Sequence, residues 1–173
     1  MKAKQHTRVT VISVIALILL LAFDQFTKYL AVTCLKGKAP VVLIPGALEF
    51  QYLENRGAAF GSLQNMQGVF WILTLVFLAA ALYFFVRMPK TKRYYPLAGC
   101  CAVLVAGALG NFIDRVANQY VVDFIYFSLI DFPVFNVADI YITVSFIFIL
   151  ALVFFYYKEG DFSFLTAKKK RQD

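Results

Sequence analysis

Long apolar runs alternate with short polar stretches along the sequence. A membrane-spanning helix needs roughly 20 mainly apolar residues, and four runs approach that length: residues 9–30, 69–86, 96–113 and 137–157. Nearly all Asp, Glu, Lys and Arg residues lie between or beside these runs. The pattern predicts four transmembrane helices that form one integral-membrane domain over residues 1–173.

The two connections at residues 31–68 and 116–136 carry a different pattern. Apolar and polar side chains alternate over residues 48–53, after the turn signal Pro45-Gly46, and residues 121–127 are similarly strand-like. An open sheet edge cannot cross the hydrocarbon core, because its backbone groups would lack hydrogen-bond partners. The pattern therefore predicts a small β-sheet that lies on the membrane surface.

The third apolar run has a stripe of small residues at i, i+4 spacing, formed by Ala98, Ala102, Ala106 and Gly110. Small side chains allow a neighbouring membrane helix to approach closely. The stripe predicts that the four helices form a packed bundle.

Charge and composition agree with a membrane protein. Hydrophobic residues make up 61% of the chain and charged residues only 16%. The net charge of +7 does not indicate a nucleic-acid partner, because the basic residues flank the spans instead of forming one face. They precede the first span, join the second to the third and follow the fourth, so the positive-inside rule predicts that both termini are cytoplasmic. The segments 31–68 and 116–136 are then the outer loops.

His6 is the only histidine, and it lies in the basic N-terminal segment. A Ser-His-Asp triad or a histidine-rich zinc site would have to be built around it. The sequence therefore indicates neither kind of site.

Polar residues from distant segments gather at the outer ends of the predicted spans. They are Asp24, Lys28, Asn55, Arg56, Asn111, Asp114, Arg115, Asp123, Asn136 and Asp139. Charges at membrane depth are costly and usually pair, line a cavity or carry function. Interfacial anchoring explains any one of them, but a set drawn from four segments indicates a site.

Spacing and surroundings suggest different roles within this set. Asp24 and Lys28, at i and i+4, are expected to pair along one helical face. Asp114 and Arg115 are interpreted as structural. Asp123 and Asp139 both lie among apolar residues, and two desolvated carboxylates that face each other hold one proton near neutrality. That arrangement is typical of aspartic-protease chemistry, although spacing alone does not show that these two residues meet.

Five motifs in order resemble the lipoprotein signal peptidase (signal peptidase II) family. They are DQFTK at 24–28, NRGAAFG at 55–61, GNFIDR at 110–115, VVDF at 121–124 and FNVAD at 135–139. One motif would carry little weight, but five in register on a four-span chain are specific.

The resemblance implies that Asp123 and Asp139 are catalytic. It also implies substrate-binding or supporting roles for Asp24, Lys28, Asn55, Gly57, Ala59, Asn111, Asp114, Arg115, Asn136 and Ala138. The implied fold is four transmembrane helices with a small extracytoplasmic β-cradle, in the bacterial cytoplasmic (inner) membrane. The implied activity is cleavage of diacylglyceryl-modified prolipoproteins just before the lipidated cysteine. The resemblance implies no metal or organic cofactor. The cyclic peptide globomycin is the implied inhibitor, membrane lipid surrounds the enzyme, and a monomer is expected.

Two other functions remain open from the residues alone. A small transporter or channel would also contain intramembrane acids, but the acids gather toward one face. A Ser-Lys peptidase would use Lys28 with Ser62 or Ser128, although no motif joins either serine to that lysine.

Overall fold

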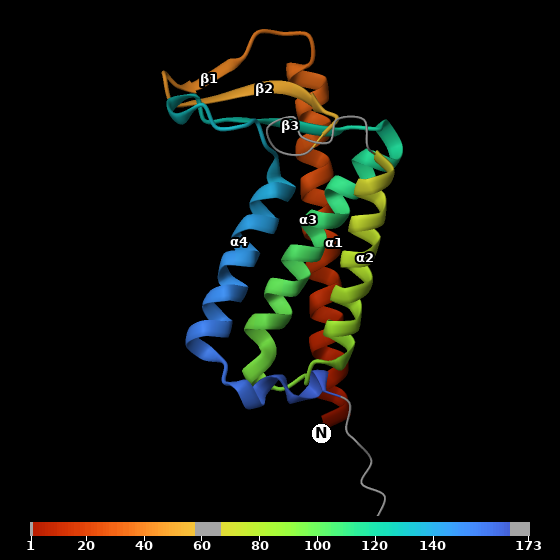
Figure 1. Cartoon of the computed structure of the whole chain (residues 1–173). Helices are drawn as coiled ribbons and strands as arrows, with labels where there is room; N and C mark the ends of the chain where they lie inside the picture. Colours follow the sequence, from red (N-terminus) through yellow and green to blue (C-terminus); the bar gives the residue numbers. More distant parts are fainter. Residues whose placement is uncertain (1, 58–66, 167–173) are drawn as a thin grey trace, which may run out of the picture.

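The computed structural model describes residues 2–57 and 67–166, and Figure 1 shows a helix bundle with a small sheet across one end. Four helices in this part of the chain are long and apolar enough to cross a membrane. They are α1 (Lys2–Leu35), α2 (Gln67–Arg87), α3 (Tyr95–Asn118) and α4 (Val137–Ala151), which the π-helical segment η4 (Leu152–Tyr156) extends to a span of 20 residues. The predicted number of spans is therefore confirmed. We call the end that carries the sheet the sheet end and the end that carries the N-terminus the tail end.

Helix α1 is longer than predicted. It has 34 residues, which corresponds to about 50 Å at 1.5 Å per residue, and it continues to Leu35 instead of ending near residue 30. No Pro or Gly interrupts it, so helical hydrogen bonding runs on past the apolar stretch. The final turns of α1 project beyond the span and support the sheet.

Helix α3 packs against each of the other three helices. The predicted small-residue stripe faces these contacts, because Ala98, Ala102, Ala106 and Gly110 are all buried. The helix ends at Gln119, which adopts the left-handed conformation with φ of 66°, and the chain then turns into the sheet.

The sheet is antiparallel, with the order β1 (Val41–Ile44), β2 (Leu48–Asn55) and β3 (Val121–Tyr126). The two strands predicted from alternation correspond to β2 and β3. Strand β1 was not predicted, because four consecutive apolar residues give no alternation, and all four are exposed at the sheet edge. Pairing of Asn55 with Val121 brings the end of β2 next to the start of β3.

Each end of the bundle has its own apolar cluster. At the sheet end, Ala31 and Leu35 of α1 pack against Val122 and Phe124 of β3. At the tail end the cluster is largely aromatic and includes Tyr94 and Tyr157, whose rings stack with centroids 5.6 Å apart. The last described helical segment, η5 (Glu159–Leu165), closes this end through an ion pair between Asp161 and Arg93 at 2.5 Å.

Between the ends, the outward surface is apolar. Leu19 is 65% exposed, Val76 63% and Phe155 89%. A soluble monomer rarely exposes such a continuous apolar surface, whereas a bilayer solvates it. The exposed pattern therefore supports the membrane assignment independently of helix length.

Gly107 tests the close approach of α3 to α4. A Cβ atom at this position would lie 2.6 Å from the Ala138 carbonyl oxygen and 2.9 Å from Ile142 Cγ1. We expect Gly107→Ala to lower the free energy of unfolding by about 1–3 kcal/mol through overpacking, measured as a lower Tm in detergent micelles. Gly99→Ala in the same helix is the control, since no atom lies within 4 Å of its added Cβ. Equal Tm changes in the two variants would contradict the packing argument.

Candidate active site

Asp123 lies in the middle of β3 and is 1% exposed. Its two carboxylate oxygens accept hydrogen bonds from two side-chain amides: Asn55 Nδ2 donates to Oδ2 at 2.8 Å, and Asn136 Nδ2 donates to Oδ1 at 2.6 Å. Asn55 ends β2 and Asn136 precedes α4. The carboxylate is therefore held from two sides by separate elements.

Asp139 is placed by the first turn of α4. Asn136 is the N-cap of this helix: its Oδ1 accepts from the Asp139 backbone N–H at 3.0 Å, and Asp139 Oδ2 accepts from the Asn136 N–H at 3.1 Å. This reciprocal pair is a capping box, which fixes the orientation of both side chains. The other oxygen, Oδ1, accepts from Asn111 Nδ2 at 2.7 Å.

The two acids therefore share Asn136, whose side chain binds Asp123 and whose backbone binds Asp139. Burial raises the pKa of Asp123 to about 7, and the nearby charge of Asp139 adds to the rise, while hydrogen bonds from Asn55 and Asn136 oppose it. Asp139 is only partly buried. The arrangement has a carboxyl group that titrates near neutrality beside a second acid that a substrate can reach.

A buried ionic cluster lies directly behind the acids. Lys28 Nζ is 3.0 Å from Asp24 Oδ2, 3.1 Å from Asp114 Oδ2 and 2.9 Å from Asn111 Oδ1. The predicted i, i+4 pairing of Asp24 with Lys28 is confirmed. Asn111 connects this cluster to Asp139, because its Oδ1 accepts from Lys28 while its Nδ2 donates to Asp139.

The cluster also holds the backbone on which the acids lie. Asp24 Oδ1 accepts from the Ala138 N–H at 2.9 Å, at the start of α4. Asp114 Oδ2 accepts from the Val122 N–H at 3.1 Å, one residue before Asp123. Ala138 and Val122 are thus fixed by carboxylates from α1 and α3.

Two further candidate residues lie at the rim. Asn55 Oδ1 accepts from the buried Gly57 N–H at 3.0 Å, which turns the chain after β2 and aims the Asn55 amide at Asp123. Arg115 lies over the Phe70 ring of α2 at 4.6 Å and interacts electrostatically with Asp139 and Asp123. Ala59, the remaining candidate, lies outside the described residues.

Comparison with known proteins identifies the family. The family model described as "Signal peptidase (SPase) II" matches residues 15–155. The chain is also 38% identical over 149 residues to the lipoprotein signal peptidase of Streptococcus pyogenes serotype M5 (strain Manfredo), covering 86% of this chain and 95% of that protein. The chain belongs to the signal peptidase II family. This membership makes it a protease and agrees with cleavage of prolipoprotein signal peptides.

Two solved structures described as bacterial membrane enzymes have the same fold as this family member. One has a TM-score of 0.73 at 38% identity and covers 82% of this chain and 86% of its own. The other has a TM-score of 0.71 at 36% identity and covers 84% and 94%. The four-helix bundle with its small antiparallel sheet is therefore an established fold for membrane enzymes.

Two residues of this signal peptidase II site were not predicted as site residues, although Gly110 was predicted to belong to the small-residue stripe. Gln25 Nε2 lies 3.2 Å from Asp24 Oδ2, Asp114 Oδ1 and the Gly110 carbonyl oxygen, so it joins α1 to α3. Gly110 leaves the space that Asp24 occupies, because an added Cβ would overlap the Asp24 carboxylate. Both residues lie in the motifs on which the family resemblance rests, and this was the only indication in the sequence that they belong to the site.

The alternative Ser-Lys peptidase finds no support in the geometry. Lys28 is engaged by two carboxylates and an amide oxygen. Ser128 lies in η3 (Ser128–Ile130), and its buried hydroxyl has no hydrogen-bond partner in the described part of the chain. Ser62 lies outside the described residues. Within the same part, no group of His, Cys, Asp and Glu is arranged to hold a metal ion.

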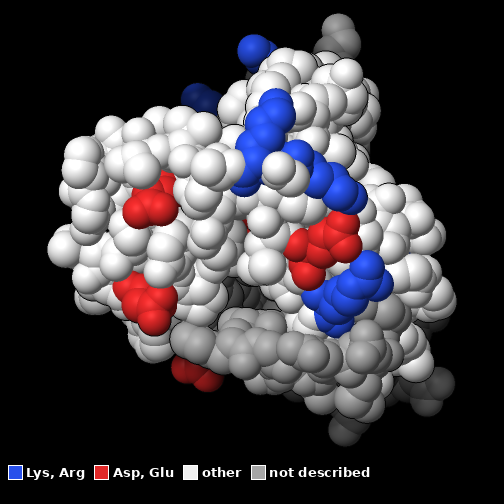
Figure 2. All heavy atoms as spheres, turned by 90° about the horizontal axis from the view of Figure 1, so that it is seen from above, with Lys and Arg blue, Asp and Glu red and all other residues white. Residues whose placement is uncertain are grey.

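Figure 2 shows the sheet end face-on, with small groups of acidic and basic side chains on a largely uncharged surface. One such group is an ion-pair chain in which Glu54 binds Lys36 at 2.9 Å and Arg56 at 3.1 Å. The hydrogen bond from Lys36, with that from Arg56, lowers the pKa of Glu54 to about 2 despite partial desolvation. This partly exposed acid is therefore ionised at neutral pH, whereas Asp123 titrates there.

Lys28 is the residue whose removal tests the buried cluster. Lys28→Met leaves the carboxylates of Asp24 and Asp114 buried without a cation, so we expect a loss of about 3–5 kcal/mol in the free energy of unfolding. Lys36→Met removes the solvent-screened pair with Glu54 and is expected to lower the free energy of unfolding far less. Thermal unfolding of both variants in the same detergent measures the difference. A Lys28→Met protein as stable as Lys36→Met would contradict the role of the cluster.

Proposed function

We propose that the protein is an aspartic endopeptidase that removes signal peptides from diacylglyceryl-modified prolipoproteins by cutting just before the lipidated cysteine. The observation that carries the proposal is the arrangement of Asp123 and Asp139 around Asn136. Family membership supplies the reaction class, and these two acids are the groups with the right environment to perform it.

The two carboxyl groups share one proton near neutral pH. The ionised carboxylate accepts a proton from a water molecule as the water oxygen attacks the scissile carbonyl carbon, while the protonated partner donates a hydrogen bond to the carbonyl oxygen. The tetrahedral intermediate then collapses, the C–N bond breaks and the leaving amine takes up the proton. Asn136 holds both acids in one orientation throughout, because it is bonded to each.

The neighbouring polar groups divide into two sets. Asn55 and Arg115 lie at the rim, where they are suited to bind the substrate backbone. The cluster of Asp24, Lys28, Asn111 and Asp114 supports the acids from behind, so it acts through position and not by contact with substrate. Preorganised donors in a water-poor site stabilise developing charge more strongly than water does.

The depth of the site favours a lipidated substrate. The acids lie where the sheet meets the ends of α3 and α4, so a peptide bond beside a bilayer-anchored cysteine reaches them without leaving the membrane surface. Acyl chains gain little by moving from lipid to protein, so recognition should depend on the thioether-linked glyceryl group. A cyclic peptide such as globomycin is expected to compete for the same site, and the protein is expected to act as a monomer.

The orientation that we propose places both termini in the cytoplasm and the sheet end at the outer face of the bacterial cytoplasmic membrane. The tail end carries Arg87, Lys92 and Arg93, in agreement with the positive-inside rule. A transporter is disfavoured, because the buried ion pairs interlock at one end, and the lining of the cavity in the opposite half of the bundle is uncharged apart from Lys90.

The catalytic pair is tested by Asp123→Asn and Asp139→Asn. Each variant is expected to lower cleavage of a purified lipidated precursor by at least about 100-fold, because an amide performs neither proton step. Asp131→Asn is the matched control: Asp131 is exposed, and its carboxylate accepts a hydrogen bond from the Tyr126 hydroxyl, so this variant should retain activity. Full activity of either site variant would refute the assignment. Equal turnover of an unlipidated precursor would refute the substrate class while leaving the chemistry intact.

The shared proton predicts a specific pH dependence. Activity should fall above about pH 7, since the pKa of Asp123 is about 7 and loss of the last proton removes the acid. The hydrogen bond from Asn55 lowers that pKa, so Asn55→Ala should move the alkaline limb of kcat/KM to higher pH, whatever its effect on the maximum. Lys36→Met, which leaves Asn55 in place, should not move the limb. A shift to lower pH in Asn55→Ala would be inconsistent with the proposed pair.

Orientation is tested by cysteine labelling in intact cells. Cys34 is exposed and would itself react with the label, so each cysteine is introduced into a chain that carries Cys34→Ser. A membrane-impermeant maleimide should then label Lys38→Cys and Asn118→Cys, whereas Lys92→Cys should react only after permeabilisation. Labelling of Lys92→Cys in intact cells would reverse the topology and place the acids at the cytoplasmic face.

A further inference from the structure

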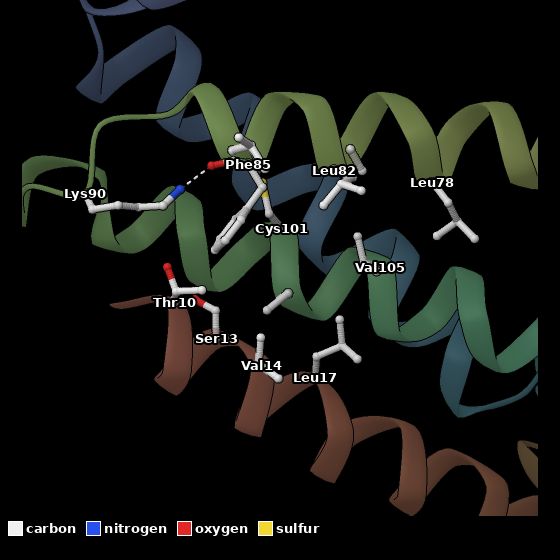
Figure 3. A pocket seen from close by; sticks show the side chains of 13 residues that line it. Thr10, Ser13, Val14, Leu17, Leu78, Leu82, Phe85, Lys90, Cys101 and Val105 are labelled. Atoms are coloured by element: carbon white, nitrogen blue, oxygen red, sulfur yellow. Dashed lines mark hydrogen bonds between the residues drawn. The ribbon is translucent and has the colours of Figure 1, made fainter. Parts of the chain in front are cut away.

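A cavity of about 440 Å³ lies in the tail-end half of the bundle, away from the acids. Its walls come from α1 and α2, and its floor comes from α3, as Figure 3 shows. The lining residues are Thr10, Ser13, Val14, Leu17, Leu78, Ala81, Leu82, Phe85, Val86, Lys90, Cys101, Ala102 and Val105. Apart from Lys90, this lining is uncharged.

The cavity has the form of a groove along the helices. On α1 the lining extends from Thr10 to Leu17, which corresponds to about 10 Å along the helix axis. Small side chains at Ala81 and Ala102 leave the space between the taller walls, and Leu82 is 64% exposed at the groove edge. In a membrane, lipid chains reach an apolar groove of this kind. Water would be costly there, because it would lack hydrogen-bond partners.

Lys90 lies at one end of the groove with its amine directed inward (Figure 3). The residue is only 6% exposed. Its Nζ donates to the Phe85 carbonyl oxygen and lies 3.7 Å from the centroid of the Phe85 ring. In the part of the chain that the structure describes, Nζ has no other hydrogen-bond acceptor and no acidic partner.

A helix-capping role accounts for only part of this arrangement. Phe85 lies in the last turn of α2, where carbonyl groups have no helical partner, so one N–H of Lys90 satisfies one such group. An ammonium has three N–H donors, and burial lowers the pKa of Lys90 because no anion compensates for the lost hydration. The two remaining donors indicate a site for an anion at the end of an apolar groove.

We propose that this groove binds one acyl chain of an anionic phospholipid, with the lipid phosphate accepting a hydrogen bond from Lys90. The combination of an apolar groove and a terminal cation matches a chain joined to a phosphate. Lys90 lies beside the basic residues Arg87 and Lys92 at the tail end, the level at which headgroups lie. In the orientation proposed above this is the cytoplasmic leaflet, where basic pockets between helices bind anionic headgroups. The inference does not depend on the peptidase chemistry.

Native mass spectrometry of the full chain, released from detergent with added lipid, tests the proposal. The probes are dioleoyl phosphatidylglycerol and dioleoyl phosphatidylcholine, which share acyl chains and differ in headgroup charge. We expect one tightly retained phosphatidylglycerol per protein and about fivefold weaker retention of phosphatidylcholine, the effect of about one interfacial cation.

Three lysine variants and two alanine variants distinguish binding in the groove from attraction to general surface charge. Lys90→Met should bind the two lipids equally. Lys92→Met, which removes a nearby exposed cation, should keep the preference for phosphatidylglycerol, and so should Lys90→Arg. Ala81→Leu fills the groove and should lose tight binding of both lipids. Ala80→Leu adds the same side chain on a face of α2 outside the lining and should bind as the unmodified chain does.

Three results would overturn the proposal. They are no preference for phosphatidylglycerol in the unmodified chain, an equal loss of that preference in Lys92→Met and Lys90→Met, and unchanged lipid retention in Ala81→Leu. Cleavage of a lipidated precursor by each variant shows that it is folded, because none of these residues contacts the acids. Failure of the lipid site would leave the peptidase proposal standing, and loss of the peptidase activity in Asp123→Asn would leave the lipid site unaffected.

Discussion

The ammonium group of Lys28 is the charge around which the sheet end is organised. It is almost completely buried, and so are the carboxylates of Asp24 and Asp114 that bind it at 3.0 and 3.1 Å. Burying these groups in a membrane helix bundle is costly unless every partner is present. Each member of the cluster therefore constrains the position of the others, and through backbone hydrogen bonds it fixes Ala138 at the start of α4 and Val122 in β3.

The same cluster explains why two pairs of aspartates behave differently. Asp24 and Asp114 share the cation Lys28 at hydrogen-bond distance, which compensates one of their two negative charges. Asp123 and Asp139 bind only amides and backbone N–H groups in the described part of the chain, without an ion pair. Their charges repel each other in a desolvated setting, which favours retention of a proton. The proposed acid-base chemistry therefore falls on the pair of aspartates that forms no ion pair with Lys28.

The two ends of the bundle consequently have separate physical roles. At the sheet end, polar groups interlock and leave an acid pair at the membrane surface. At the tail end, aromatic packing and the Arg93–Asp161 pair close the bundle, and small side chains open an apolar groove that ends in Lys90. The acid pair and the groove therefore lie at opposite ends of the same four helices, and the proposed peptidase and lipid-binding roles use different residues.

Periodicity and local residue chemistry determined the number of spans, the small-residue face of α3, two of the three strands and the Asp24–Lys28 pair. These features depend on neighbours within a few residues, so the sequence contains them directly. The meeting of Asp123 with Asp139 was implied only by family resemblance, because it depends on a capping box at Asn136 and on strand pairing between distant segments. The role of Gln25 as a bridge and the unpartnered donors of Lys90 depend on which helices become neighbours. Tertiary structure alone decided these features, since the energy of a buried polar group is set by partners that lie far away along the chain.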